Sequence, residues 1–369
     1  MLQITTAEID LNAIKHNISL IRKKLRNKKI LLAVKANGYG HGAVAVSQAV
    51  EDEQLIDMLG VATPAEGIEL RQAGIQLPIL VLGLILPDEE VIASLIEYNL
   101  SQTVADAAVI DAIARTARQM NTAIPLHLKI DTGMGRIGCE PSEAVGLAEH
   151  ITDQTSLVLE GVFSHLPVSD IPESDFTRQQ IDKFKHLLRA IEESGITVPS
   201  IHIANSAAIL NDDEPAGNMV RAGIMAYGYL PSPACRRSMP IIPAMTLKSR
   251  IVFLKRVRKG TPLSYGHTYI TDRDATIATI PVGYGDGYNR LLSNKGKVLI
   301  SGKEYPVVGR VCMDQVLVNL GDDHHHLGEE VILFGRETIT AETIAEWTET
   351  IPYEITCSVS RRIPRVYHT

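Results

Sequence analysis

Eight short apolar segments alternate with stretches that can form helices across the first 230 residues of the chain. The apolar segments are 30–36, 56–62, 78–83, 101–105, 124–130, 157–165, 200–206 and 218–223. Near-continuous apolar strands that alternate with helices are typical of a parallel sheet with covered faces. Eight such units predict an α/β fold, a (β/α)8 barrel of the TIM type, with a doubly wound open sheet as the structural alternative.

Two of the expected helices carry recognisable end signals. One begins after Asp10, a residue type that caps helix N-termini, and repeats apolar residues on one face from Leu11 to Leu25. The other has the capping-box pattern Thr177-x-x-Gln180 at its start and Gly195 at its end. Both helices are expected to cover the outside of the sheet.

A second domain is expected after the barrel, because strand-like segments follow one another from about residue 240 with little helix between them. We place the barrel at 9–235 and a mainly β C-terminal domain at 236–369, with residues 1–8 packing against the second domain. The proline-rich stretch 230–243 marks the boundary. Ser301-Gly302 predicts a hairpin turn, and a helix is expected at Thr340–Trp347 with Thr340 as its N-cap.

Charge and composition exclude several classes of protein. The net charge of −7 argues against general nucleic-acid binding. The longest charge-free apolar run, residues 77–87, is too short for a membrane span, which needs about 20 residues. Four widely spaced cysteines and the absence of a signal-peptide pattern favour reduced thiols in the cytoplasm.

Polar residues at the ends of the apolar segments point to a site, because reactive groups in these barrels gather at the carboxyl ends of the strands. They are Lys35, Arg136, His165, Asn205, Ser206 and Arg221, the last with Gly223 close behind it. Lys35 lies inside an apolar run, where desolvation lowers the pKa of an amine and makes it a usable nucleophile. The alternative is a lysine that reaches out to solvent.

The residues after the seventh and eighth strands predict a phosphate site. Backbone N–H groups around Gly223 and Ile224, with the hydroxyl of Ser206, match the usual place of such sites in these barrels. The first and eighth strands are neighbours in a closed barrel. A phosphorylated ligand held there would therefore reach Lys35.

Two further motifs carry weaker signals. Residues 133–138 match the glycine pattern of dinucleotide-binding loops, with Glu160 as the acid expected beyond it, but four units precede the motif instead of none. The consecutive histidines 324–326 resemble a metal site, yet adjacent side chains on a loop rarely converge on one ion. We therefore expect neither a nicotinamide cofactor nor a metal.

Several motifs, taken together and in order, resemble the bacterial alanine racemases. They are AVKANGYGHG around Lys35, KIDTGMGRIG at 129–138, HIANSA at 202–207, RAGIMAYG at 221–228, SYGHTY at 264–269, VCMDQ at 311–315 and the tail around Tyr353. The similarity spans nearly the whole chain, including the β domain. The loop after His165 departs from the family pattern.

The resemblance implies pyridoxal 5′-phosphate joined to Lys35 as an aldimine, with the cofactor serving as an electron sink. It implies that the phosphate is held by Tyr39, Ser206, Gly223, Ile224 and Tyr353. Asn205 is also assigned to the cofactor site, Arg221 to the pyridine nitrogen, and His165 to the side of the ring. An arginine, which stays cationic, leaves that nitrogen unprotonated.

The resemblance further implies a homodimer with shared active sites and a two-base reaction. Lys35 serves one face of the substrate, and the partner subunit's Tyr265 serves the other. Arg136 and the partner subunit's Met313 bind the carboxylate of alanine, and Lys129 matches a lysine that is often carbamylated. The residues matching the access channel are Asp170, Arg290, Arg310 and Ile351.

The expected function is interconversion of L-alanine and D-alanine, which supplies D-alanine for peptidoglycan. Racemisation of another small amino acid such as serine is one alternative. A decarboxylase on the same architecture would carry a carboxylate in place of Arg221. A protein that only carries pyridoxal phosphate would lack the β domain and its tyrosine.

Overall fold

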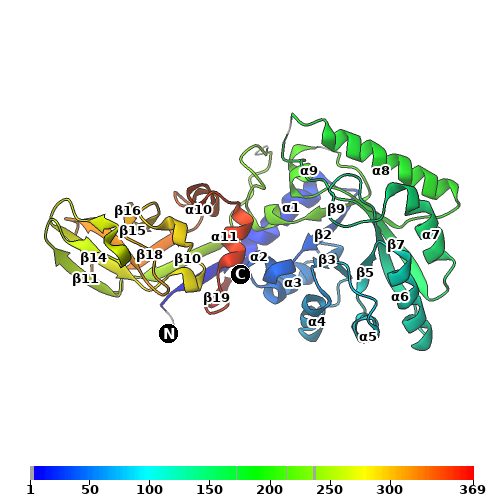
Figure 1. Ribbon diagram of the computed structural model, residues 1–369, viewed down its shortest axis with the longest axis horizontal. Helices are drawn as coiled ribbons and strands as arrows, with labels where there is room; N and C mark the ends of the chain where they lie inside the picture. The colour runs from blue at the N-terminus through cyan, green and yellow to red at the C-terminus, as the bar shows by residue number, and fades with distance from the viewer. Residues whose placement is uncertain (1–3, 172, 213, 236–237) are drawn as a thin grey trace.

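The chain forms a barrel and a strand-rich domain that lie at opposite ends of the molecule (Figure 1). The computed structural model describes residues 4–171, 173–212, 214–235 and 238–369. The predicted boundary between residues 235 and 236 borders residues outside these ranges, so it stays a prediction.

All eight predicted apolar segments form strands of one closed barrel, in chain order. The strands are β2 (Lys29–Ala33), β3 (Met58–Val61), β4 (Ile79–Val81), β5 (Ser101–Val104), β6 (Ile124–Lys129), β7 (Leu157–Phe163), β8 (Ser200–His202) and β9 (Met219–Ala222). Strand β9 pairs in parallel with β2, from Lys29 opposite Met219 onward. This pairing closes the barrel and excludes the open sheet.

Helices follow the strands and cover the outside of the barrel (Figure 1). They are α1 (Leu11–Lys24), α3 (Ala43–Asp52), α4 (Pro64–Gln72), α5 (Glu89–Glu97), α6 (Ala107–Gln119), α7 (Ala144–Thr152), α8 (Phe176–Glu193) and α9 (Ser206–Asn211). Within the described ranges, none of the helices has the length and apolar character needed to cross a membrane.

The helix-end predictions had mixed outcomes. Asp10 caps α1 by accepting a hydrogen bond from the N–H of Ala13, as expected. Gly195 follows the C-cap of α8 with a left-handed φ of 87°. The capping box at Thr177 was wrong, because α8 begins earlier and has Asp175 at its N-cap.

The second domain is built on a nine-stranded sheet in the order β11-β14-β17-β16-β15-β18-β10-β1-β19. Its strands are β1 (Thr6–Asp10), β10 (Met245–Arg250), β11 (Phe253–Val257), β14 (Ala275–Ile280), β15 (Lys297–Ile300), β16 (Lys303–Val308), β17 (Val316–Gly321), β18 (Glu330–Phe334) and β19 (Arg365–His368). Strand β1 precedes the barrel in sequence yet pairs with β10 and β19. The start of the chain is thus tied to its end.

Two local predictions for this domain are confirmed. Ser301 and Gly302, with φ values of 48° and 79°, form the turn of the hairpin β15–β16. Thr340 caps helix α10 (Ala341–Thr348) through a hydrogen bond from the N–H of Thr343.

Helix α11 (Pro352–Ser358) brings the second domain to the mouth of the barrel, beside the short helix α2 (Lys35–Tyr39). The rings of Tyr353 and Tyr39 lie 5.8 Å apart between centroids. A Cβ on Gly40 would lie 2.0 Å from the carbonyl oxygen of Thr356, so this close approach requires a glycine. The site at the barrel mouth is therefore walled by both domains.

Candidate active site

A cavity of about 320 Å³ opens at the carboxyl ends of the barrel strands. It is lined by Ala33, Lys35, Tyr39, Ala62, Leu82, Gly83, Lys129, Arg136, Ile137, Phe163, His165, Asn205, Ser206, Arg221, Gly223 and Tyr353. Most of the residues predicted from the strand ends and from the resemblance are therefore gathered in one place. Ile224 directly follows Gly223, at the start of a 3-10 turn.

The sequence predicted that Lys35 lies inside a strand. This was wrong, because Lys35 lies two residues beyond the end of β2. The next residues, Ala36 to Tyr39, all have positive φ values between 51° and 63°. A left-handed conformation costs roughly 1–2 kcal/mol per non-glycine residue, so surrounding contacts must hold this turn. Glu66 accepts hydrogen bonds from the N–H groups of Ala36 and Ala62, and Asn37 accepts one from Ala43.

The environment of Lys35 favours the neutral amine. Burial lowers the pKa of Lys35, and the positive charges of Arg136 and Arg221 lower it further. Glu66 acts in the opposite direction and is outweighed. A neutral amine is the form that acts as a nucleophile or accepts a proton.

Arg221 is buried, and its guanidinium is held from several sides. Nη1 and Nη2 donate to the carbonyl oxygens of Ser164, His202 and Ile203 at 2.8–3.0 Å, and to ring nitrogens of His165 and His202 at 3.0 Å. Within the described ranges, every hydrogen bond that Arg221 donates comes from these two atoms. Nε–H is thus the donor left for a ligand in the cavity.

The protonation state of His165 follows from this contact. A guanidinium has no acceptor, so Nδ1 of His165 must accept the hydrogen bond from Arg221. Burial, followed by the charge of Arg221, lowers the pKa of His165 to about 2. The same burial lowers the pKa of Arg221 to about 9, which leaves the guanidinium protonated at neutral pH. A neutral imidazole thus stands beside a fixed cation.

Gly223, Tyr39 and Ser206 form an anion cradle in the wall of the cavity. A Cβ on Gly223 would lie 3.0 Å from the hydroxyl of Tyr39 and 3.3 Å from Oγ of Ser206, so these groups converge where the side chain is missing. Burial raises the pKa of both Tyr39 and Tyr353, which keeps them as hydroxyl donors. Oγ of Ser206 accepts from the N–H of Gly223, so its own proton is free to point at a ligand.

Lys129 lies near the cations Arg221 and Arg136 and is only 3% exposed. Its Nζ stands 4.4 Å from the centre of the Phe163 ring. Burial lowers its pKa well below the usual range, and Arg221 and Arg136 contribute in the same direction. Arg136 is exposed at the mouth. The cavity is therefore rich in positive charge and suited to an anionic ligand.

Tyr265 and Met313 do not line the cavity of their own chain. Both are on loops of the second domain and are 72% and 53% exposed. Ser264 joins the two loops, because its Oγ donates to the carbonyl of Arg310 and lies 3.8 Å from Sγ of Cys312. Tyr265 and Met313 are thus presented from one loop cluster.

The dinucleotide-type motif is explained by its own backbone. The carboxylate of Asp131 accepts hydrogen bonds from the N–H groups of Gly133, Met134 and Gly135, each at 2.8 Å. Amides that would cradle a pyrophosphate are therefore already paired. Glu160 lies on β7 and takes part in another set of contacts, described below.

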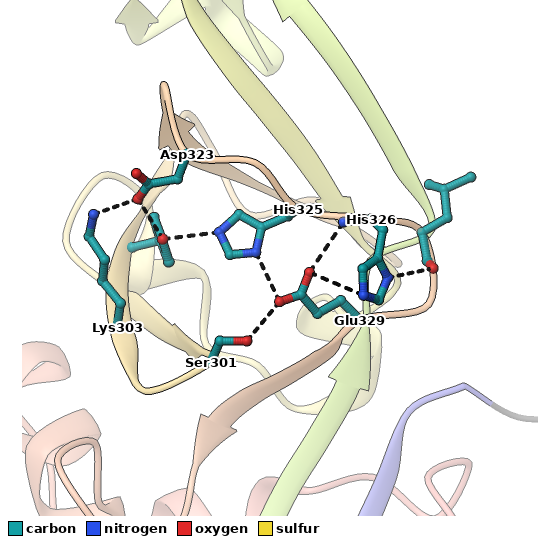
Figure 2. Close-up of polar contacts among 8 residues, drawn as sticks. Ser301, Lys303, Asp323, His325, His326 and Glu329 are labelled. Atoms are coloured by element: carbon teal, nitrogen blue, oxygen red, sulfur yellow. Dashed lines mark hydrogen bonds and ion pairs between the residues drawn. The ribbon is translucent and has the colours of Figure 1, made fainter.

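The histidine run belongs to a polar network of the second domain (Figure 2). His325 lies 3.0 Å from a carboxylate oxygen of Glu329, and His326 lies 3.9 Å from the other. Lys303 pairs with Asp323 nearby. In the part of the chain that the structure describes, no three His, Cys, Asp or Glu side chains are placed to hold a metal ion.

Comparison with known proteins identifies the family. The model of the alanine racemase N-terminal domain matches residues 9–231, and that of the C-terminal domain matches residues 244–367. The chain belongs to the alanine racemase family. The alanine racemase of Desulforamulus reducens is 46% identical over 370 residues, which cover 98% of each chain.

Solved structures of alanine racemases share the whole architecture. That of Clostridium difficile 630 is 40% identical, with a TM-score of 0.94, and covers 100% of this chain and 96% of its own. That of Bartonella henselae, solved with covalently bound pyridoxal phosphate, is 26% identical with a TM-score of 0.88, covering 99% of this chain and 100% of its own. As an alanine racemase, the chain is a pyridoxal-phosphate-dependent isomerase.

The residues present fit pyridoxal phosphate. The anion cradle suits the phosphate group of the cofactor. Nε–H of Arg221 suits an unprotonated ring nitrogen, and the amine of Lys35 suits the aldehyde of the cofactor. Sequence reasoning missed Phe163 and the buried pair His127 and His202, although both histidines stand out as polar residues within apolar runs.

Proposed function

We propose that this alanine racemase inverts alanine with two bases, Lys35 on one face of the substrate and the partner subunit's Tyr265 on the other. The main support for this proposal is the chemistry of the cavity. It offers a partly desolvated amine, while the phenol of the same chain faces solvent on the other domain. Groups on both sides of the substrate are the most direct way to remove a proton from one face and return it to the other.

Pyridoxal phosphate bound in this cavity supplies an electron sink that makes the α-proton of an amino acid removable. Tyr39, Ser206 and Tyr353 would hold its phosphate by donating hydrogen bonds from their hydroxyl groups, and Gly223 with Ile224 would give the phosphate room and backbone contact. Arg221 would hold the ring nitrogen without transferring a proton to it, because the guanidinium stays protonated near neutral pH. His165 and Asn205 fix the two flanks of the site.

The substrate carboxylate is assigned to Arg136 at the cavity mouth and to the partner subunit's Met313. Lys129 lies among like charges with a lowered pKa, and a neutral amine is the form that reacts with carbon dioxide. We propose that Lys129 is carbamylated. The resulting anion would offset the positive charges of Arg136 and Arg221.

The partner's contribution implies a homodimer. Tyr265, Met313 and Ile351 are exposed apolar side chains of the second domain, and an interface between copies would cover them. We place Asp170, Arg290, Arg310 and Ile351 along the access channel between the copies. Residue 172, in the loop that carries Asp170, lies outside the described residues.

We further propose that the enzyme acts in the cytoplasm and supplies D-alanine for peptidoglycan.

The two-base reaction is tested by incubation of the purified holoenzyme with L-alanine in D2O. Decay of the circular dichroism signal, with deuterium at the α-carbon of the D-alanine formed early in the reaction and little in the remaining L-alanine, supports two-base racemisation. Loss of carbon dioxide, or α-exchange with full retention of configuration, would refute it. L-serine as a second substrate tests the specificity.

A further inference from the structure

Five consecutive strands of the barrel each contribute one residue to a buried chain of hydrogen bonds. Arg221 on β9 contacts His202 on β8, which contacts His127 on β6, which contacts Glu160 on β7. Ser101 on β5 contacts the same carboxylate. The chain runs from the proposed cofactor site down the inside of the barrel.

The direction of every bond in this chain is fixed by Arg221. A guanidinium only donates, so Nδ1 of His202 accepts at 3.0 Å and the proton of that ring sits on Nε2. Nε2 of His202 then donates to Nδ1 of His127 at 2.9 Å, which places the proton of His127 on its Nε2. Nε2 of His127 must therefore donate to Glu160 at 3.1 Å. The imidazoles of His127 and His202 are therefore both neutral. The series of hydrogen bonds that starts at Arg221 requires a hydrogen-bond acceptor at its other end.

Glu160 is suited to be that acceptor. Burial raises the pKa of its carboxyl, but hydrogen bonds from His127 and Ser101 outweigh this and hold the pKa below its usual value. Its side chain is 28% exposed, whereas that of His127 is fully buried. Ser101 is the first residue of its strand, so the carboxylate meets solvent near the amino-terminal end of the barrel, away from the cavity.

The barrel wall is shaped around these rings. A Cβ on Gly161 would lie 2.3 Å from Nδ1 of His127, so the ring occupies the space of a side chain. The register between β6 and β7 shifts between Leu126 and His127, an irregularity that redirects a side chain. His202 stacks on Phe163 at 4.6 Å with an interplanar angle of 4°. These contacts restrict the positions of both rings.

We propose that Glu160 is a positioning residue for Arg221, acting through His127 and His202 to fix the tautomers that hold the guanidinium. The inference rests on the proposed role of Arg221 at the cofactor ring. Without an acceptor at Glu160, the tautomers of both histidines can reverse, and His202 would then present an N–H to the donor Nη1 of Arg221. The guanidinium would lose this anchor.

The test compares Glu160→Leu, which removes the acceptor, with Glu160→Gln, whose amide oxygen still accepts. Long-range ¹H–¹⁵N spectra of the cofactor-free enzyme with labelled histidine report the tautomers directly. We expect the wild type and Glu160→Gln to show both buried rings protonated on Nε2, and Glu160→Leu to show altered signals. In the holoenzyme, Glu160→Leu should lower kcat by about tenfold and weaken pyridoxal phosphate binding, while the KM for alanine changes little.

Asp57→Leu serves as the matched control. Asp57 also accepts hydrogen bonds near the start of the barrel strands, from Arg22 and the N–H of Ile30, and its side chain is 38% exposed. This control should lose stability but keep the histidine signals and kcat. Unchanged tautomers in Glu160→Leu would overturn the proposal, and so would altered tautomers with unchanged kcat and cofactor affinity. The spectra need neither cofactor nor substrate, so they stand even if the two-base reaction fails.

Discussion

Arg221 donates a hydrogen bond from Nη2 to Nδ1 of His165 at 3.0 Å, so a permanent cation and a neutral imidazole face the same cavity. The contact joins His165, two residues beyond the end of β7, to Arg221 on β9, and these two strands are not neighbours in the barrel. It fixes the ring of His165 and one edge of the guanidinium at once. The positions of Arg221 and His165 in the site therefore depend on each other.

Arg221→Lys is expected to abolish most activity and to destabilise the protein. A lysine carries all its donors on one atom and leaves carbonyl acceptors of Arg221 unpaired, at about 1–3 kcal/mol each. Arg71→Lys is the matched control, because Arg71 also donates to several carbonyl oxygens but lies outside the cavity. Thermal unfolding should shift for both variants, and alanine turnover should fall only for Arg221→Lys. Equal turnover in the two variants would refute the assignment.

Gly223→Ala should weaken pyridoxal phosphate binding by about tenfold or more, because the new methyl group enters the anion cradle between Tyr39 and Ser206. Titration of the cofactor-free enzyme, followed by absorbance, measures the effect. Gly146→Ala in α7, where a Cβ meets nothing within 4 Å, should leave the affinity unchanged. Wild-type affinity in Gly223→Ala would place the phosphate elsewhere.

His165→Gln should make the cofactor-free enzyme less sensitive to acid. The pKa of His165 is 6.5 in a model peptide and about 2 in the folded chain. Between these values only the unfolded chain binds the proton, so stability falls as the pH drops below 6.5. The loss is about 1.4 kcal/mol per pH unit for one group. Urea unfolding at pH 7.5 and 5.5 should show a smaller drop in His165→Gln by about 1 kcal/mol. Parallel drops would show that His165 is protonated in the folded state.

Lys35→Ala and Tyr265→Phe should complement each other in a mixed dimer. Each variant alone should be inactive, but a mixed dimer would hold one site with Lys35 from one chain and the tyrosine from the other. Random pairing of equal amounts should recover about a quarter of wild-type activity, since half the dimers are mixed and each has one intact site. No recovery in dimers purified by two affinity tags would place both bases on one chain.

The barrel could be predicted from sequence because its strands are buried on both faces and so appear as uninterrupted apolar runs. The position of Lys35 beyond the end of its strand could not be predicted from the sequence. Ala36 and Asn37 adopt left-handed conformations that their own propensities disfavour and that Glu66 and Ala43 hold in place from elsewhere in the fold. Tertiary contacts decided this turn.

The site was predictable to different degrees. Lys35, Arg221 and Ser206 lie at or just beyond the carboxyl ends of their strands, where the fold alone places reactive groups. Tyr265 came only from family resemblance, because an exposed loop tyrosine carries no chemical signal of its own. Glu160 was visible in the sequence but attached to the wrong motif, since its partners Ser101 and His127 lie 59 and 33 residues away along the chain.

The most direct test of the account is borohydride reduction of the purified holoenzyme, followed by peptide mapping. Lys35 is expected to carry the reduced pyridoxyl phosphate, because its amine lies in the cavity with a lowered pKa and, unlike that of Lys129, is not proposed to be carbamylated. Lys129 lines the same cavity and is the internal control. The label on Lys35 alone is the predicted result. A label on Lys129, or no label with the cofactor bound, would contradict the account.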